Sequence, residues 1–295
     1  MLQRLQAPLN STPEHGVSDR RPSEVAHLLP DSSKETEGYG SELMEVDRFV
    51  ISSSSELRLV AINEPAGVGA ERLRTLASRL KHAQQQYAIK KLLVTSAVPG
   101  EGKTLISANL AITLAMHRQK TLIIDGDLRG GSLGGLFDVE DHHGLADWWE
   151  TRGSIMTSLC RAAQVPLWVL PAGKYHDGPL GILQSPDFVE LMAQLYAMFD
   201  WIIIDTPPLT PFADAATLAN LADAVLLVTR QGITPKKLLR EALKSIDGTR
   251  IIATVLNEAQ VSDQQYYHRY YQQSSRHLAS GSHTSGSQLL TIKNK

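Results

Sequence analysis

The stretch Ser96-Ala-Val-Pro-Gly-Glu-Gly-Lys-Thr104 decides the fold of this 295-residue chain. It follows the apolar run 91–95 and precedes a helix-like segment over residues 105–116. A glycine-rich loop between a buried strand and a helix start is typical of a P-loop, whose backbone N–H groups surround phosphates. In such a loop the lysine neutralises the β and γ phosphate oxygens and the Thr hydroxyl ligates Mg²⁺. The sequence therefore predicts binding of ATP or a similar nucleoside triphosphate with Mg²⁺.

The loop departs from two better-known patterns. The first glycine of the general motif Gly-x-x-x-x-Gly-Lys-Thr falls at Ala97. The partitioning and septum-placing ATPases carry an additional lysine five residues before the phosphate-binding lysine. Val98 occupies that place here, since the phosphate-binding lysine is Lys103. The chain therefore lacks the signature lysine of that class. The nucleotide-binding residues that we predict from the loop are Pro99, Gly100, Glu101, Gly102, Lys103 and Thr104.

The composition suits one large α/β domain or two small ones, since 42% of the residues are hydrophobic and the formal net charge is -2. The single cysteine, Cys160, has no partner for an internal disulfide, so we expect a reducing cytoplasm. No apolar run reaches the roughly 18 residues of a membrane span, and the first thirty residues lack a signal-peptide core. We therefore expect a cytoplasmic protein without a span of its own.

Composition divides the chain into three parts. Residues 1–56 are rich in Ser, Pro and Glu without periodicity, which predicts a disordered N-terminal tail. Residues 57–262 carry the apolar runs and form the predicted P-loop domain. Residues 263–295 are polar and contain a tyrosine cluster, which predicts a flexible C-terminal tail.

Apolar runs alternate with helix-like periods in the middle of the chain. Strands that carry Val, Ile and Leu continuously are buried on both faces, as in a parallel sheet between two helical layers. We therefore predict a three-layer α/β fold of the P-loop NTPase type with a mostly parallel sheet, in which 167–171 is an edge strand of either direction. The predicted strands span residues 91–97, 120–126, 167–171, 201–205, 224–229 and 250–256. The predicted helices span residues 66–88, 103–117, 144–151, 186–198, 213–222 and 234–246.

Three aspartates follow two of the apolar strands. Asp125 and Asp127 come after one strand and Asp205 after another. Ligands of open parallel sheets bind outside the carboxyl ends of the strands, so all three acids are expected to face the phosphates. We predict that Asp205 holds Mg²⁺, and that one of Asp125 and Asp127 serves Mg²⁺ while the other accepts a proton. The alternative is that each aspartate only caps the next helix or turn.

These motifs together resemble one protein family. The P-loop, the segment Ile123-Ile-Asp-Gly-Asp-Leu-Arg129 and the segment Ile202-Ile-Ile-Asp-Thr-Pro-Pro208 are similar to those of the bacterial tyrosine kinases (BY-kinases) of capsule and exopolysaccharide export. The similarity covers residues 65–258, and its most specific part is the Asp-x-Asp-x-Arg pattern. The resemblance implies ATP-dependent phosphorylation of protein tyrosine on a fold related to partitioning ATPases.

The resemblance also implies roles for individual residues. Lys103, Asp125 and Asp127 would serve catalysis, and the metal ligands would be Thr104, Asp127 and Asp205. Asn257 lies where relatives place a residue that faces the adenine, although an Asn at a strand end is equally often a turn former.

Four tyrosines lie close together in the C-terminal tail. The resemblance implies that they are phospho-acceptors for a neighbouring copy of the kinase. The alternative is a short amphipathic segment that docks on the domain, but the surrounding Ser and Gln residues offer nothing that would bury it. The predicted acceptors are Tyr266, Tyr267, Tyr270 and Tyr271.

The predicted helix before the P-loop carries an incomplete assembly motif. Relatives use a Glu-x-x-Arg-x-x-Arg pattern there to form rings, and Glu71 and Arg74 fit this pattern. Ala77 stands where the last arginine is expected, and Arg79 is the nearest substitute. The resemblance thus permits a ring-shaped homo-oligomer, while the alternative is a solvated helix with an i, i+3 ion pair.

The family resemblance implies a membrane partner. Because the sequence shows no span, a membrane-anchored polysaccharide co-polymerase would activate the kinase and recruit it to the inner face of the membrane. We expect no nucleic-acid partner, since the pair Trp148-Trp149 lacks an accompanying basic stripe. Two other functions stay open: a partitioning-like ATPase switch without kinase activity, and a nucleotide-binding scaffold that has lost catalysis.

Overall fold

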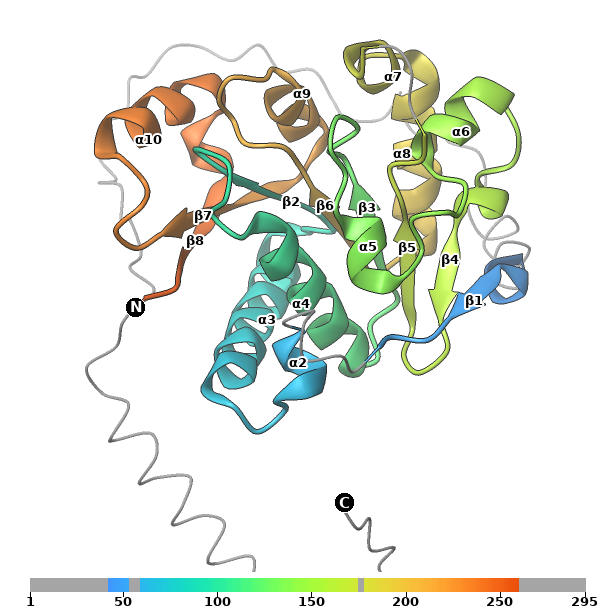
Figure 1. Ribbon diagram of the computed structural model, residues 1–295, viewed down its shortest axis with the longest axis horizontal. Coiled ribbons are helices and arrows are strands. Elements are labelled where there is room, and N and C mark those ends of the chain that lie inside the picture. Colours follow the sequence, from blue (N-terminus) through green and yellow to red (C-terminus); the bar gives the residue numbers. More distant parts are fainter. Residues whose placement is uncertain (1–41, 53–58, 175–177, 260–295) are drawn as a thin grey trace, which may run out of the picture. The chain divides into compact units, whose positions relative to one another are not determined.

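The computed structural model describes residues 42–52, 59–174 and 178–259, which form a sheet with helices on both of its faces (Figure 1). In these residues the sheet has eight strands in the order β1-β4-β5-β3-β6-β2-β7-β8. Neighbouring strands are parallel except for β4 and β5. The strands are β1 (Asp47–Phe49), β2 (Lys91–Ser96), β3 (Thr121–Asp125), β4 (Cys160–Ala162), β5 (Leu167–Leu170), β6 (Trp201–Asp205), β7 (Ala224–Arg230) and β8 (Ile251–Asn257).

Two hydrophobic clusters place the helices on opposite faces of the sheet. In β2, Leu92 and Val94 join the cluster that contains α2 to α5, whereas Leu93 joins the cluster that contains α6 to α9. This alternation follows from the two-residue period of a strand. The helices are α2 (Val60–Asn63), α3 (Val68–Tyr87), α4 (Lys103–Met116), α5 (Leu133–Phe137), α6 (Leu145–Thr151), α7 (Leu180–Leu183), α8 (Pro186–Met198), α9 (Asp214–Leu221) and α10 (Lys236–Ala242), with 3₁₀ turns η2 (Ile155–Ser158), η3 (Leu243–Ser245) and η4 (Gly248–Arg250).

The predicted fold class is confirmed, and the six predicted strands and six predicted helices are present. Two further strands, β1 and β4, were not predicted and have three residues each. Strands this short carry no readable alternation. The strand β5 was predicted at an edge, but it lies between β4 and β3 inside the sheet.

The folded part begins earlier than predicted. Residues 42–52 were expected in the disordered N-terminal tail, yet β1 pairs with β4 in this segment. Phe49 and Ile51 are buried in the core, and the Phe49 ring packs edge-on against Phe137. Apolar burial therefore attaches this segment to the domain. The rest of the predicted tail and the predicted C-terminal tail beyond residue 259 lie outside the described residues.

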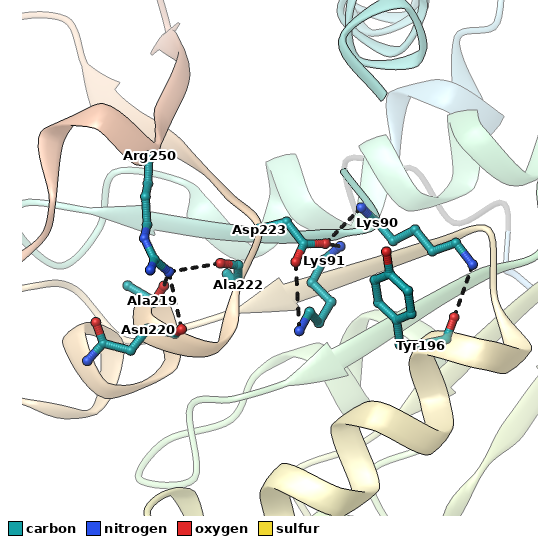
Figure 2. A network of polar contacts seen from close by, with 8 residues as sticks. All are labelled: Lys90, Lys91, Tyr196, Ala219, Asn220, Ala222, Asp223 and Arg250. Carbon is teal, nitrogen blue, oxygen red and sulfur yellow. Dashed lines mark hydrogen bonds and ion pairs between the residues drawn. The ribbon is translucent and has the colours of Figure 1, made fainter. Parts of the chain in front are cut away.

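A polar network fixes the start of the strand that leads into the P-loop (Figure 2). The Asp223 carboxylate accepts hydrogen bonds from the backbone N–H groups of Lys90 and Lys91, at 2.9 and 2.8 Å. The Lys90 ammonium donates to the Tyr196 carbonyl at 3.1 Å and lies 4.7 Å from the centre of the Tyr196 ring. Arg250 donates to three carbonyls at the end of α9. The amino ends of the adjacent strands β2 and β7 are thereby held together, at the end of the strands opposite the P-loop.

Among the residues that the structure describes, no helix combines the length and the apolar character that crossing a membrane requires.

Candidate active site

The P-loop connects β2 to α4 with two glycines in the left-handed region, at φ +78° for Gly100 and +89° for Gly102. Side chains of L-residues rarely adopt this conformation. A Cβ on Gly102 would also lie 2.2 Å from Nδ2 of Asn257, whereas a Cβ on Gly100 would meet nothing within 4 Å. The backbone conformation at position 102 thus favours glycine, as the motif predicted, and a side chain there would also displace the Asn257 amide.

Glu101 was predicted to bind the nucleotide, but its side chain forms hydrogen bonds within the protein. The carboxylate is fully buried, accepts a hydrogen bond from Val98 N at 3.0 Å and accepts another from the Thr234 hydroxyl. Only the backbone of Glu101 is left to face a ligand. Pro99 is exposed in the same loop and has no N–H to offer.

Lys103 and Thr104 form the first turn of α4, where the helix dipole favours anions. Lys103 is only 9% exposed, and its positive charge lowers the pKa of Asp205. The Thr104 hydroxyl also favours the ionised form of the same carboxylate and lies 3.4 Å from the Ser132 hydroxyl. The structure therefore brings the predicted lysine, threonine and strand-end aspartate together.

Asp125 and Asp205 are neighbours, because β3 and β6 are adjacent and these two residues are paired in the register. Both are only 1% exposed. Burial, together with the charge of Asp205, raises the pKa of Asp125 to about 8. The Asp125 carboxylate accepts hydrogen bonds from the backbone N–H groups of Asp127 and Leu133, each at 3.1 Å. Asp125 thus orders the loop after β3 as well as carrying a proton near neutral pH.

Burial also raises the pKa of Asp205, to about 6, although Thr104, Lys103 and Ser107 all favour its ionised form. Ser107 donates a hydrogen bond to Oδ1 of Asp205 at 2.9 Å. Ser107 was not among the predicted site residues. Its position four residues after Lys103, one turn further along the same helix face, was the only available signal.

Asp127 is the most accessible of the three acids, being partly exposed where Asp125 and Asp205 are buried. Its Oδ1 accepts hydrogen bonds from the backbone N–H groups of Arg129 and Gly130, each at 3.3 Å. This arrangement is the turn-capping contact that was the alternative for these aspartates. It leaves the second carboxylate oxygen of Asp127 without a bond in this turn.

Arg129 ties this turn to the start of α9. Its Nε donates to the buried carboxylate of Asp214 at 2.7 Å, and its guanidinium lies 4.8 Å from the centre of the Phe212 ring. The hydrogen bond to Asp214 raises the pKa of the Arg129 guanidinium above its usual value. Asp214 was not predicted, because an aspartate at a helix start normally indicates only a cap. The pair holds the loop that carries Asp127 against the neighbouring helix.

The donor atoms at this site fit a hard cation. Thr104, Asp127 and Asp205 offer hydroxyl and carboxylate oxygens, which are the ligands that Mg²⁺ prefers. Within residues 42–52, 59–174 and 178–259, no three His, Cys, Asp or Glu side chains are grouped as a metal site of protein ligands alone. Mg²⁺ commonly uses one or two carboxylates together with substrate phosphates and water.

The remaining predicted residues lie beside the P-loop, on α3 or outside the described residues. Asn257 ends β8 beside the P-loop, and its Nδ2 donates to the Glu101 carbonyl at 3.0 Å. On α3, Arg74 forms the i, i+3 ion pair with Glu71 at 2.6 Å, Arg79 is exposed and Ala77 is fully buried. The predicted acceptors Tyr266, Tyr267, Tyr270 and Tyr271 lie outside the described residues.

The raised pKa of Asp125 predicts a specific effect of pH on stability. The ordinary pKa is 3.8 and the folded value about 8, so the folded chain binds more protons between these values than the unfolded chain. The free energy of unfolding therefore falls as pH rises through this window. Asp125→Asn removes this titration, and we expect the variant to gain stability relative to the unmodified chain from about pH 5 to about pH 9.

Urea denaturation in EDTA without nucleotide, at both ends of this pH range, measures the effect. Asp141→Asn, at an exposed position, is the matched control and should leave the pH dependence unchanged. Parallel pH dependences for Asp125→Asn and the unmodified chain would show that Asp125 does not titrate as described.

The strand, glycine loop and helix, with strand-end acids beside the lysine, define a nucleotide-binding P-loop NTPase. A family model described as ParA, NUBPL iron-transfer P-loop NTPase, matches residues 88–290. Tyrosine-protein kinase YwqD of Bacillus subtilis is 30% identical over 220 residues, which cover 74% of this chain and 93% of that protein. The chain therefore belongs to the bacterial tyrosine kinases, within the ParA group of P-loop NTPases, and the resemblance predicted from the motifs is confirmed.

Two further similarities concern the size and fold of relatives. Tyrosine-protein kinase wzc of Salmonella typhimurium is 29% identical over 233 residues, which cover 77% of this chain but 32% of that protein. The crystal structure of the chimerical protein CapA2B2 superposes with a TM-score of 0.66 at 26% identity and covers 77% of this chain and all of the other. In wzc, the region similar to this chain is thus part of a much longer protein.

Proposed function

We propose that this chain transfers the γ-phosphoryl group of ATP to protein tyrosine, including tyrosines of its own C-terminal tail. The observation that carries the proposal is the pairing of Asp125 and Asp205 at the ends of adjacent strands beside Lys103. Relatives of the chain are named tyrosine-protein kinases. The site thus combines a positive charge, on Lys103, for the phosphates with carboxylates for the metal and the proton.

Each group has a distinct task in the proposed reaction. Lys103 and the P-loop N–H groups neutralise the phosphate oxygens as negative charge shifts during transfer. Thr104, Asp127 and Asp205 would hold Mg²⁺, which supplies further neutralisation of the triphosphate when it is bound. Asp125 would accept the tyrosine proton when its carboxylate is ionised, and the burial that raises its pKa makes that carboxylate a stronger base.

A membrane protein is the proposed activator. The wzc relative is aligned over 32% of its length, so a kinase of this family can be one part of a larger polypeptide. We infer that this chain acts together with a membrane-anchored polysaccharide co-polymerase at the cytoplasmic face of the membrane. In this setting the kinase would regulate the polymerisation and export of capsule or exopolysaccharide.

Assembly into a ring is part of the proposal. Glu71, Arg74 and Arg79 lie on α3, and Arg79 is exposed. A ring would place the tail of one copy near the site of the next, which is what phosphorylation between copies requires. The Glu71–Arg74 pair would then have to exchange its internal partner for one across the interface.

Phosphorylation of the purified full-length chain tests the function. The chain is incubated with ATP and Mg²⁺, with and without the cytoplasmic part of a candidate activator, and phosphotyrosine is mapped by mass spectrometry. We expect modification of the tail tyrosines, increased by the activator. ATP turnover without phosphotyrosine in either condition would favour the partitioning-like switch over the kinase.

A further inference from the structure

Two side chains from the ends of β7 and β8 hold consecutive carbonyl groups of the P-loop. Arg230 Nη1 donates to the Gly100 carbonyl at 3.2 Å, and Asn257 Nδ2 donates to the Glu101 carbonyl at 3.0 Å. The orientation of the Asn257 amide is fixed by its other end, because Oδ1 accepts a hydrogen bond from Glu258 N at 3.0 Å. Nδ2 is therefore the end that faces the loop.

Holding a carbonyl fixes the N–H group of the same peptide. The two groups point in opposite directions across a planar peptide unit. The peptide whose carbonyl belongs to Gly100 carries the N–H of Glu101, and the next peptide carries the N–H of Gly102. These are backbone donors of the phosphate cradle, and glycine makes this segment especially free to rotate. By holding the two carbonyl groups, Arg230 and Asn257 would keep the N–H groups of Glu101 and Gly102 directed toward the phosphates.

We propose that Arg230 and Asn257 are positioning residues that orient the P-loop peptides and thereby set its affinity for the triphosphate. The proposal deepens the nucleotide site described above and rests on it. It gives Asn257 a different task from the adenine contact that the family resemblance implied. Its amide touches the loop backbone instead, so close that a Cβ at position 102 would have to displace it.

Further contacts hold this pair in place. Arg230 Nε and Nη2 bind the Glu258 carboxylate at 2.7 and 2.5 Å. The Thr234 hydroxyl accepts a hydrogen bond from Arg230 N at 3.0 Å and donates to the buried Glu101 carboxylate. The turn after β7 therefore contacts the loop through both a carbonyl and a side chain. An exposed ion pair such as Arg230–Glu258 contributes little to stability, so its value here is orientation.

Binding of two probes separates orientation of the cradle from contact with the base. Calorimetry measures the affinity of the full chain for ATP and for inorganic tripolyphosphate, each with Mg²⁺. Asn257→Asp keeps the size of the side chain but removes its N–H donor, and Arg230→Gln removes the guanidinium. We expect each change to weaken both probes by about tenfold, since a lost hydrogen bond of about 1.4 kcal/mol corresponds to that factor.

Controls make each result decisive. Lys244→Gln removes one positive charge at an exposed position in η3 and should leave both affinities unchanged. Asn257→Ala repeats the test without adding a negative charge, and Arg230→Lys repeats it with the positive charge kept. Melting curves without ligand check that each variant is folded. In kinase assays we expect a raised KM for ATP with a smaller change in kcat.

Weakened ATP binding with unchanged tripolyphosphate binding would overturn the proposal and assign Asn257 to the base. Unchanged affinity for both probes in folded variants would also overturn it. If the unmodified chain bound neither probe, the nucleotide site itself would be wrong, which is a separate result.

Discussion

Replacing Lys103 with methionine is expected to abolish tyrosine phosphorylation, with a loss of at least about 100-fold. Methionine has a similar length and no charge, so it cannot neutralise the phosphate oxygens. The side chain is 9% exposed at the start of α4, where solvent offers little compensation. The change also removes the positive charge that favours the ionised form of Asp205, which raises the pKa of that carboxylate further. Both effects weaken nucleotide and metal binding together.

Phosphotyrosine formed with ATP and Mg²⁺ measures this loss, and circular dichroism checks that the variant is folded. Lys120→Met makes the same substitution at an exposed position before β3 and should retain full activity. Labelling of the folded Lys103→Met variant at the normal rate would contradict the assignment of the site.

Local sequence signals were sufficient for the centre of the fold. The β2–P-loop–α4 unit was predictable, because a continuous apolar strand, a glycine loop and a helix follow one another within 26 residues, 91–116. Asp125 and Asp205 were predictable for a related reason, since each directly ends a strand that is apolar on both faces. Parallel pairing of β3 and β6 then places them side by side.

The parts that were missed depend on contacts between distant segments. Arg129 and Asp214 are 85 residues apart, and Glu101 and Thr234 are 133 residues apart. No local pattern distinguishes a P-loop glutamate that faces a ligand from one that is buried against a later turn. The motif therefore indicated Glu101 as part of the loop but could not show that its side chain is buried against a later turn.

The early start of the domain has the same kind of cause. The strand β1 has only three residues, and two of them are the charged Asp47 and Arg48. Only β4, more than 100 residues later, supplies its hydrogen-bonding partner. Because the segments on both sides are rich in Ser and Glu, the composition did not indicate that Phe49 and Ile51 are buried.

Changing the four tail tyrosines to phenylalanine is expected to remove most autophosphorylation while preserving ATP binding. Phenylalanine keeps the ring but has no hydroxyl to receive the phosphoryl group. The nucleotide site lies in the P-loop domain, so its affinity for ATP should not change. The substituted residues are Tyr266, Tyr267, Tyr270 and Tyr271.

Tyr87→Phe is the matched control for this variant. Tyr87 ends α3 and is 71% exposed, so an unspecific kinase would label it as readily as the tail. We expect its substitution to leave labelling unchanged, and calorimetry to give equal ATP affinities for all three chains. Because each phosphate adds a charge of about -1.5 to -2, a phosphorylated tail should be repelled from a site that contains Asp125, Asp127 and Asp205. Undiminished labelling of the fourfold variant would place the acceptors elsewhere in the chain and remove the basis for this release.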